Sequence, residues 1–383
     1  MKVLFYLGIF GLLLFEFLKV YFIMPMPGSQ QWASLEFAYL LHQSRWFFRC
    51  SLIIIAVVGL MPAFAVTRKW LPITCLVIVV GFVWMLNFKM SADAMFKEPQ
   101  NLNFQSKGQF TGSDSMLVVV TSNRQETKAY PVRYLVYHHQ VRDYVGGDPV
   151  MVTYCSVCRT GRVFSPLIDG NEATFRLVGM DYFNAMFEDA GTGSWWQQAT
   201  GEAIAGPLKG HQLKELEALQ MSVHGFFNAY PDGLIMEADP DFLTEYDSLG
   251  KYEVGESESE LTGTSPFSWD EKSWVVGVTV DGESKAYDWN ALVAERLIHD
   301  QIGNESIVLI LSDDSQSFVA FRRESSDTFS LERDTLISGK GKNYSFTGAS
   351  LNPSYPDLER IQAYQEFWHS WRTFRPNTTR YPD

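Results

Sequence analysis

The stretch Tyr154-Cys155-Ser156-Val157-Cys158-Arg159-Thr160-Gly161 follows one predicted strand, Val150–Tyr154, and precedes another, Arg162–Phe164. Short runs of β-branched and aromatic residues on either side of a Gly-containing turn predict strands. Cys155 and Cys158 therefore lie where two strands are joined. They are the feature of this chain with the clearest power to react or to bind a metal, so the functional interpretation starts from them.

Part of this region recurs later in the chain. The matched segments are Lys128-Ala129-Tyr130 with Lys285-Ala286-Tyr287, Asp143 with Asp300, Gly146 with Gly303, and Phe164 with Phe321. At the same offset, Cys155 and Cys158 align with Ser312 and Ser315. The sequence therefore predicts a duplicated unit whose first copy alone carries the thiol pair.

Three apolar runs precede this unit, at about 3–24, 46–67 and 70–88. At ~1.5 Å per residue, a helix of about 20 residues crosses a ~30 Å hydrocarbon layer. A cleavable signal peptide is an alternative for the first run, but no cleavage site follows it at Met24–Gly28. We therefore predict three transmembrane helices that anchor the chain in a lipid bilayer.

Charge limits the partners and suggests an orientation. The chain has 31 Lys and Arg against 44 Asp and Glu, a net charge of −13, and this acidity argues against nucleic acid as a partner. Positive residues are nearly balanced on the two sides of the predicted spans. The Arg68-Lys69 pair favours a cytoplasmic hairpin, which predicts a multi-pass protein of the inner membrane whose soluble region is extracytoplasmic.

The soluble region is predicted to have an α+β fold that is rich in β structure, because each copy reads as a strand, a short helix and then several strands. The helices are expected within Lys128–Tyr144 and Tyr287–His299. The predicted domains are a membrane anchor (1–90), a linker (91–112), a first copy with Cys155-x-x-Cys158 (113–239), an acidic linker (240–272) and a second copy without the thiols (273–383).

Motifs around the thiols resemble the bacterial and archaeal family known as domain of unknown function 3179. They are Val145–Val150, Thr153-Tyr154-Cys155-x-x-Cys158, Gly179-Met180, Met186, Thr192-Gly193-Ser194-x-Trp196, Ala203–Leu208 and the ending Phe367–Thr378. The resemblance covers residues 113–383 and leaves out the three spans. It implies a recognisable unit and supplies no reaction.

One run departs from the family pattern. In the family a His-Glu-x-x-Asn-Asp run commonly precedes the Gly-Gly pair, whereas this chain has His139-Gln140-Val141-Arg142-Asp143. His139 matches the start of the pattern, but Gln140 replaces the Glu. The resemblance therefore provides no catalytic carboxylate at this position.

A soft-metal site is the first interpretation of Cys155 and Cys158. Two thiolates three positions apart on a turn form a common half-site for copper, zinc or iron. His139 is the best nitrogen ligand, and Met186 or Met180 offers a thioether that completes the shell. We predict that such a centre serves metal handling or electron transfer.

Two other interpretations of the thiols stay open. A dithiol that exchanges with disulfides is the second, and Arg159 beside the pair favours a thiolate electrostatically. A structural disulfide or a reduced buried pair is the third. The second copy lacks both thiols, which argues that the fold does not need them.

Four further residues are predicted to line a pocket beside the thiols: Asp143, Asp189, Trp196 and Arg159. For Trp196, packing in the core is the simpler explanation, because aromatic residues make up 15% of the chain. A non-catalytic module for ligand binding or assembly is the alternative from another functional class. The sequence does not decide whether the protein is an enzyme, and it indicates no protein partner.

Overall fold

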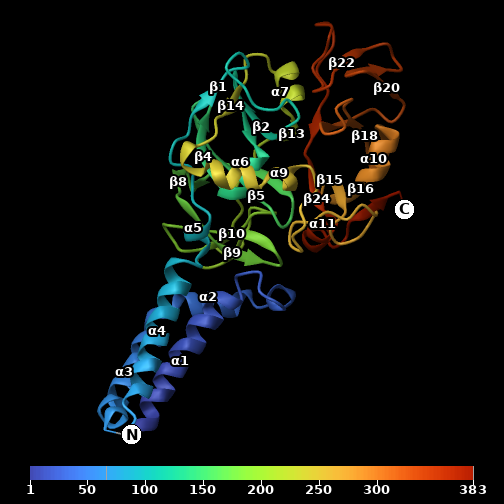
Figure 1. Ribbon diagram of the computed structural model, residues 1–383. Coiled ribbons are helices and arrows are strands. Elements are labelled where there is room, and N and C mark those ends of the chain that lie inside the picture. The colour runs from blue at the N-terminus through green and yellow to red at the C-terminus, as the bar shows by residue number, and fades with distance from the viewer. Residues whose placement is uncertain (66, 383) are drawn as a thin grey trace. The chain divides into compact units, whose positions relative to one another are not determined.

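The computed structural model of the protein describes residues 1–65 and 67–382. Val66, inside the second predicted span, and Asp383, at the end of the predicted second copy, lie outside the described residues. The protein has an α+β fold with many small sheets (Figure 1). The chain forms two compact units. The first holds Met1–Lys97, Thr174–Gln197 and Glu202–Gln212, and the second holds Glu98–Ala173, Gln198–Gly201 and the chain from Leu213 onward.

Three helices of the first unit are long and apolar enough to cross a membrane: α1 (Lys2–Tyr21), α3 (Arg45–Phe64) and α4 (Trp70–Phe88). They confirm the three apolar helices predicted from the sequence, and Figure 1 shows them in blue, side by side. Small residues let α1 approach α3 closely. A Cβ atom added at Gly59 would lie 2.2 Å from the backbone nitrogen of Phe5, so this contact requires glycine.

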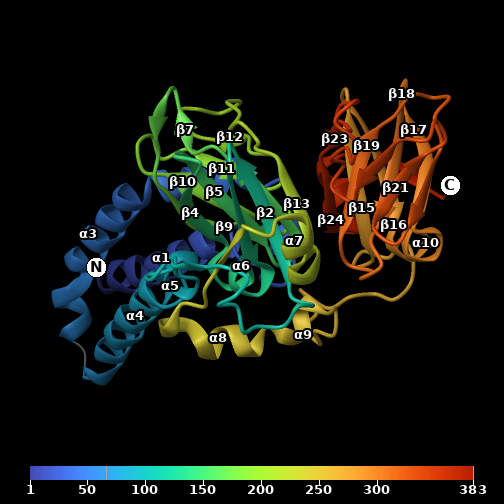
Figure 2. The ribbon, with the colours of Figure 1, turned by 90° about the horizontal axis from the view of Figure 1, so that it is seen from above.

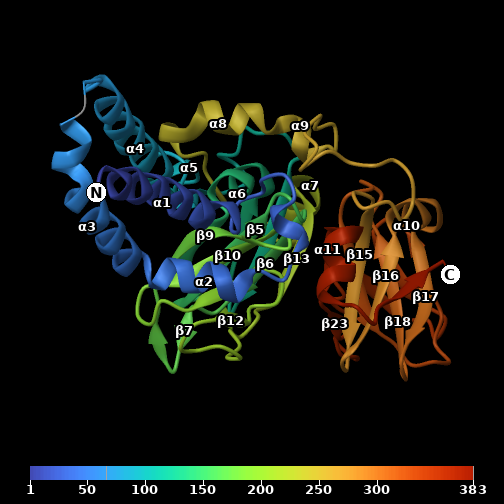
Figure 3. The ribbon, with the colours of Figure 1, turned by 90° about the horizontal axis from the view of Figure 1, so that it is seen from below.

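A small sheet belongs to the same unit as these helices. Its strands, in the order β12-β11-β10-β9, are β9 (Phe175–Asp181), β10 (Asn184–Asp189), β11 (Trp195–Gln197) and β12 (Ala203–Ala205). Helix α2 (Leu35–Gln43) lies against it (Figure 3), with Ala38 packed among Val178, Met186 and Trp195. The sequence-based boundaries assign these strands to the first copy, whereas their contacts group them with the membrane helices.

Short elements connect the spans and the sheet. The 3-10 helix Ser29–Gln31 follows α1, and α5 (Ala92–Met95) follows α4. The backbone nitrogen of Met180 in β9 donates a 2.7 Å hydrogen bond to the carbonyl oxygen of Ile23, just after α1. Strand β9 is therefore attached directly to the end of a membrane helix.

The second unit begins with a series of strands around α6. The series comprises β2 (Leu117–Asn123), β3 (Glu126–Pro131), α6 (Val132–His138), β4 (Gln140–Val145), β5 (Asp148–Cys155), β6 (Thr160–Phe164), β13 (Ala218–Ser222), α7 (Val223–Ala229) and β14 (Leu234–Met236). With β1 (Phe104–Gln105), these strands form the sheets β1-β14-β3-β2-β13 and β4-β5-β6. The hairpin β7 (Leu167–Ile168) and β8 (Asn171–Glu172) follows β6.

A second series in the same unit follows the same order of elements and is drawn in orange and red in Figure 2. It comprises β15 (Trp274–Val280), β16 (Glu283–Asp288), α10 (Trp289–Glu295), β17 (Leu297–Ile302), β18 (Glu305–Leu311), β19 (Phe318–Arg322), β23 (Arg360–Ile361), β24 (Ala363–Phe367), α11 (Trp368–Phe374) and β25 (Thr379–Tyr381). These strands form the sheets β24-β15-β16-β25 and β17-β18-β19-β23. A separate sheet holds β20 (Phe329–Glu332), β21 (Thr335–Ser338) and β22 (Asn343–Ser345).

The helices after β3 and β16 are shorter than predicted. The prediction placed a helix within Lys128–Tyr144, but only Val132–His138 is helical, and β3 and β4 take the rest. His139 ends α6 with a left-handed φ of 60°, and Arg296 ends α10 with a φ of 63°. Side-chain spacing alone does not reveal these ends, because the flanking residues pair in sheets.

The predicted acidic linker 240–272 also differs from a plain exposed loop. It contains a 3-10 helix (Pro240–Phe242), α8 (Leu243–Ser248) and α9 (Gly250–Glu253). Tyr246 and Tyr252 are each 3% exposed. Their aromatic rings bury apolar area that the acidic composition of the segment conceals.

Candidate functional site

The two thiols lie in a β-hairpin of the second unit. β5 ends at Cys155, which pairs with Thr160 at the start of β6, so Cys158 lies in the short loop between these strands. This confirms that two strands flank the thiols. Arg159 closes the loop with a left-handed φ of 56°. Cys155 and Cys158 are thiols, and each is 0% exposed.

Residues from the second series cover this loop. The backbone nitrogen of Phe367 donates a 2.9 Å hydrogen bond to the carbonyl oxygen of Cys158. Lys272 Nζ donates to the carbonyl oxygen of Val157 at 2.9 Å, and Nε2 of His369 lies 3.0 Å from the same oxygen. The thiol loop is therefore held by side chains and backbone far away in the sequence.

The Lys272 ammonium is the charged group that acts on the thiols. Burial lowers the pKa of Lys272, whereas its interactions with Cys158 and, to a smaller extent, Cys155 raise it. Nζ also lies 4.6 Å from the centre of the Phe367 ring. A cation near a thiol stabilises the thiolate, which is the reactive and metal-binding form of cysteine.

His369 beside Lys272 is a neutral imidazole. Burial and the Lys272 charge lower its pKa to about 3. Nε2 lies 3.2 Å from Lys272 Nζ and 3.0 Å from the Val157 oxygen, and one neutral ring nitrogen cannot serve both partners at once. His369 therefore contributes a neutral hydrogen-bonding group rather than a second positive charge.

Arg159, predicted to line a pocket, is buried and hydrogen bonds to other segments of the same unit. It is 0% exposed and donates to Gln365 Oε1 at 3.1 Å and to the carbonyl oxygens of Tyr252 and Glu253 at 3.0 and 2.8 Å. Its guanidinium lies 3.7 Å from the centre of the Trp274 ring. These contacts join the thiol loop to α9 and β24.

A buried ion pair lies on the other side of the hairpin. Arg162 on β6 is hydrogen bonded to Glu366 on β24, and both are about 1% exposed. Thr160 Oγ1 donates to the same carboxylate at 3.0 Å. The strand that follows the thiol loop is thus fixed to β24 by a fully desolvated salt bridge.

His139, predicted as a metal ligand, is buried in the same unit as the thiols. Its Nδ1 lies 2.9 Å from the carbonyl oxygen of Tyr154, the residue before Cys155. Burial lowers the pKa of His139 to about 4, so its ring is neutral at pH 7. Among the described residues, no group of three or more His, Cys, Asp or Glu side chains is arranged to hold a metal ion. The geometry therefore gives the predicted metal shell no support.

The two predicted thioether ligands belong to the first unit. Met186 on β10 is 0% exposed and packs in an apolar core with Val178 and Trp195. Met180 lies on β9, where its backbone nitrogen bonds to Ile23. The contacts described for both methionines are those of packing and sheet structure.

Asp189 and Trp196, predicted to line a pocket, also lie in the first unit and bond to each other. Trp196 Nε1 donates to Asp189 Oδ2 at 2.9 Å, and the same carboxylate accepts the backbone nitrogens of Thr192 and Ser194. Trp196 is 2% exposed. This network closes the turn between β10 and β11.

Asp143, the last predicted pocket residue, is part of a repeated structural pair. It accepts hydrogen bonds from Lys128 Nζ at 2.9 Å and from Tyr130 Oη at 2.8 Å. In the second series, Asp300 makes the corresponding contacts with Lys285 and Tyr287, each at 2.8 Å. A contact present in both series has no special connection with the thiols.

No pattern in the sequence pointed to Lys272 or His369 at the site. Lys272 lies at the end of the predicted acidic linker, and His369 lies in the aromatic ending Phe367–Thr378. The family resemblance of that ending was the one available signal.

Comparison with known proteins identifies a family for residues 98–378. The family model described as "Protein of unknown function (DUF3179)" matches residues 98–378, which is most of the chain. No curated protein and no solved structure matches the chain.

Proposed function

Because the chain belongs to the DUF3179 family, whose description names no activity, we propose its function from the site alone: Cys155 and Cys158 form a dithiol that exchanges with a substrate disulfide. The observation that carries this proposal is the Lys272 ammonium, which bonds inside the thiol loop and interacts electrostatically with both sulfurs. A neighbouring ammonium favours the thiolate, and the thiolate is the nucleophile in disulfide exchange.

Cys158 is the attacking thiol in this proposal, because its interaction with Lys272 is the stronger of the two. Its thiolate attacks one sulfur of the substrate disulfide, and the other substrate sulfur leaves and takes up a proton. Cys155 then loses its proton, attacks Cys158 in the mixed disulfide and releases the second substrate thiol. The substrate gains two electrons and two protons, and a bond forms between Cys155 and Cys158.

Because both thiols are buried, the proposed reaction requires the thiol loop to open first. Both thiols are 0% exposed, and the hydrogen bonds from Phe367 and Lys272 close the loop that contains Cys158. A substrate reaches the sulfur only when these bonds open. We therefore expect the reaction to be faster with small disulfides than with folded protein substrates.

The metal site is a second candidate, favoured by one observation on His139. A carbonyl oxygen only accepts hydrogen bonds, so Nδ1 of His139 carries the proton in its 2.9 Å contact with Tyr154, and Nε2 keeps a lone pair. Ligating histidines commonly make this type of bond. His139, Cys155 and Cys158 are the ligands that the sequence predicts for copper, zinc or iron, but among the described residues they do not form a group arranged to hold a metal ion. The positive charge of Lys272 opposes a cation there, so the dithiol is preferred.

The experiment uses the full-length protein in detergent. Samples are equilibrated in dithiothreitol buffers of increasing potential, denatured and labelled with a maleimide, and the modified cysteines are identified by mass spectrometry. We expect a two-electron transition at Cys155 and Cys158 that is lost in Cys155→Ser and kept in Cys50→Ser, which removes a thiol from α3. A stoichiometric metal that disappears in Cys155→Ser, without a reversible disulfide, would reject exchange and select the metal site.

We also infer that the two series of the second unit arose by duplication. The shared order of elements supports this, as do the matching bonds of Tyr130 with Asp143 and Tyr287 with Asp300. At the position of Cys155, the second series has Ser312, which donates to Asp334 at 2.8 Å. Duplication explains why thiol chemistry belongs to one series although both share a scaffold.

The proposed location is the extracytoplasmic side of the inner membrane. Arg68 and Lys69 lie between α3 and α4, and positive residues in short loops favour the cytoplasm. Three spans then place the chain after α4 on the opposite side, where dithiols are commonly oxidised. A reporter active only outside the cytoplasm, fused after the last residue, tests this: a silent reporter on a stable fusion reverses the orientation.

A further inference from the structure

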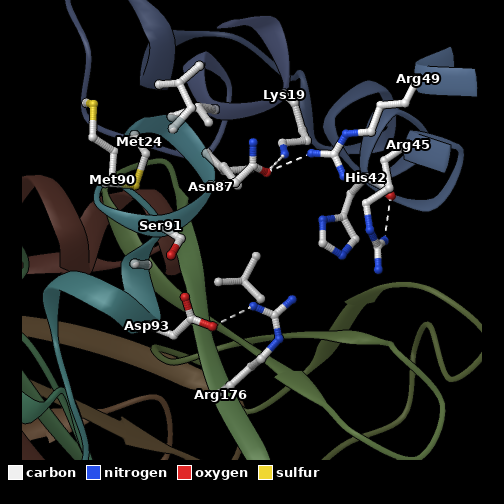
Figure 4. Close-up of a pocket in the computed structure, with 15 residues that line it drawn as sticks. Lys19, Met24, His42, Arg45, Arg49, Asn87, Met90, Ser91, Asp93 and Arg176 are labelled. Carbon is white, nitrogen blue, oxygen red and sulfur yellow. Dashed lines mark hydrogen bonds and ion pairs between the residues drawn. The ribbon is translucent and has the colours of Figure 1, made fainter. Parts of the chain in front are cut away.

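The first unit contains a cavity of about 200 Å³ at the ends of α1, α3 and α4. Figure 4 shows basic side chains from different elements around it. They are Lys19 on α1, His42 on α2, Arg45 and Arg49 on α3, and Arg176 on β9. A wall of this kind suits an anion.

Carboxylates neutralise part of this charge. The fully buried Glu16 pairs with Lys19 at 2.9 Å and also bonds to Arg49, with Nη2 to Oε2 at 3.0 Å. Asn87 Nδ2 donates to Glu16 at 2.9 Å, which completes the network. Glu16 therefore fixes the positions of Lys19 and Arg49. Its own negative charge is balanced by these two cations.

On the β9 side, Arg176 is shared between two carboxylates. It pairs with Glu188 at 2.6 Å and with Asp93 at 3.1 Å. Glu188 also lies 3.0 Å from Nε2 of His42. These contacts hold both basic side chains at the cavity.

Arg45 is the cation in excess. Its Nη1 donates to the carbonyl oxygen of His42 at 2.7 Å, and no carboxylate pairs with it within residues 1–65 and 67–382. The cavity and its partners thus hold four cations, Lys19, Arg45, Arg49 and Arg176, and three carboxylates, Glu16, Asp93 and Glu188. One positive charge is left for a ligand.

The rest of the cavity wall is apolar. The cavity lies at the ends of the membrane helices. Val20, Ile23, Leu86, Met90 and Val178 line it beside the basic groups. Near these helix ends, large aromatic side chains are exposed: Trp46 65%, Phe47 69%, Trp84 52% and Phe88 66%. Exposed tryptophans such as Trp46 and Trp84 at the ends of spans mark the level of lipid headgroups. The ligand therefore combines negative charge with an apolar part.

We propose that this cavity binds the phosphate of an anionic phospholipid headgroup, with Arg45 as its main contact. Arginine recognises phosphate through paired N–H donors, and the apolar wall accommodates the start of the acyl chains. Arg176 belongs to β9, within the segment matched by the family. A bound headgroup therefore fastens the β9–β12 sheet to the membrane helices.

The test measures the melting temperature of the full-length protein in detergent by tryptophan fluorescence. The probes are short-chain phosphatidylglycerol, phosphatidylcholine with the same acyl chains, and glycerol 3-phosphate. We expect phosphatidylglycerol to raise the melting temperature saturably, and the other two probes to have little effect. In Arg45→Gln the half-saturating lipid concentration should rise about tenfold, as one charge-assisted contact is lost.

Arg68→Gln is the matched control, because it removes an exposed cation between α3 and α4 and lies outside the cavity. It should respond to phosphatidylglycerol as the wild type does. If Arg45→Gln is too unstable to purify, Arg45→Lys keeps the charge and should show an intermediate loss. An equal response to both lipids, or an equal loss in Arg68→Gln, rejects the site. An equal response to glycerol 3-phosphate rejects the lipid as the source of the phosphate.

Discussion

Lys272 Nζ donates a 2.9 Å hydrogen bond to the carbonyl oxygen of Val157, inside the loop that separates Cys155 from Cys158. Lys272 immediately precedes the strands of the second series, whereas the loop belongs to the first. The charge beside the thiols therefore comes from the segment that leads into the series that lacks thiols. Changes to the second series should alter reactivity in the first.

Replacing Lys272 with Met tests this dependence directly. The variant keeps an unbranched side chain but loses the ammonium, so the thiolate of Cys158 loses the positive charge of Lys272 that interacts with it. We expect the rate of Cys158 alkylation by iodoacetamide near neutral pH to fall by about tenfold, equivalent to ~1.4 kcal/mol. Mass spectrometry of the labelled peptide gives the rate.

Lys251→Met is the control for Lys272→Met. Lys251 pairs with Glu258 at 3.1 Å, and both side chains are well exposed. Screened surface pairs of this kind contribute little energy. The control should alkylate at the wild-type rate, and a wild-type rate in Lys272→Met as well contradicts the electrostatic role of Lys272.

The buried histidines predict how stability depends on pH. In the folded protein the pKa of His139 is about 4 and that of His369 about 3, both below the ordinary value of 6.5. Between these values the unfolded chain binds more protons than the folded one. The free energy of unfolding therefore decreases as pH falls below 6.5, by up to ~1.4 kcal/mol per pH unit for each histidine.

Melting temperatures at about pH 7.5, 6 and 5 measure this slope. His369→Gln should make this slope shallower, because one buried histidine no longer takes up a proton on unfolding. His224→Gln changes an exposed histidine and should keep the wild-type slope. A slope that stays unchanged in His369→Gln means that this side chain is not held neutral in the folded protein.

The Arg162–Glu366 pair predicts a non-additive pair of substitutions. Both side chains are about 1% exposed, and Glu366→Gln leaves the buried Arg162 with the more distant Glu215, at 3.8 Å, as its carboxylate partner. We expect this single change to cost ~3–5 kcal/mol of unfolding free energy. Arg162→Met combined with Glu366→Met should cost less than Glu366→Gln alone, as measured by chemical denaturation. Additive costs would show that the two charges do not depend on each other.

Local sequence patterns predicted the parts of the structure that depend on neighbouring residues. The three spans follow from long apolar runs, and the strands around Cys155 and Cys158 follow from β-branched residues beside a turn. The approach of Lys272 and His369 to Val157 depends on contacts between segments far apart in the chain. No periodicity reports such contacts, so the charged part of the site was missed.

The ligands proposed from sequence show the same limit. Cys155 and Cys158 share a hairpin, so their proximity was readable from their spacing. Met180 and Met186 follow them closely in the chain, yet β9 and β10 group with the membrane helices. Nearness in sequence was a poor guide because β9 pairs its backbone with the segment after α1.

Gly179 in β9 predicts that the attachment of β9 to the segment after α1 does not tolerate a side chain. A Cβ atom at this position would lie 2.3 Å from the carbonyl oxygen of Ile23, the same oxygen that accepts the 2.7 Å hydrogen bond from Met180. Gly179→Ala should therefore push β9 away from the end of α1 and cost ~1–3 kcal/mol, the usual range for overpacking.

The matched control for Gly179→Ala is Gly81→Ala in α4, where no described atom beyond the neighbouring backbone of the helix lies within 4 Å of the added Cβ. The control should keep the wild-type melting temperature, whereas Gly179→Ala should lower it and make the β9–β12 segment more sensitive to limited proteolysis. Because the clash involves a backbone oxygen, no rotamer change relieves it, and the cost must appear as movement of the strand. An unchanged melting temperature in Gly179→Ala would mean that β9 is not seated on Ile23 as described.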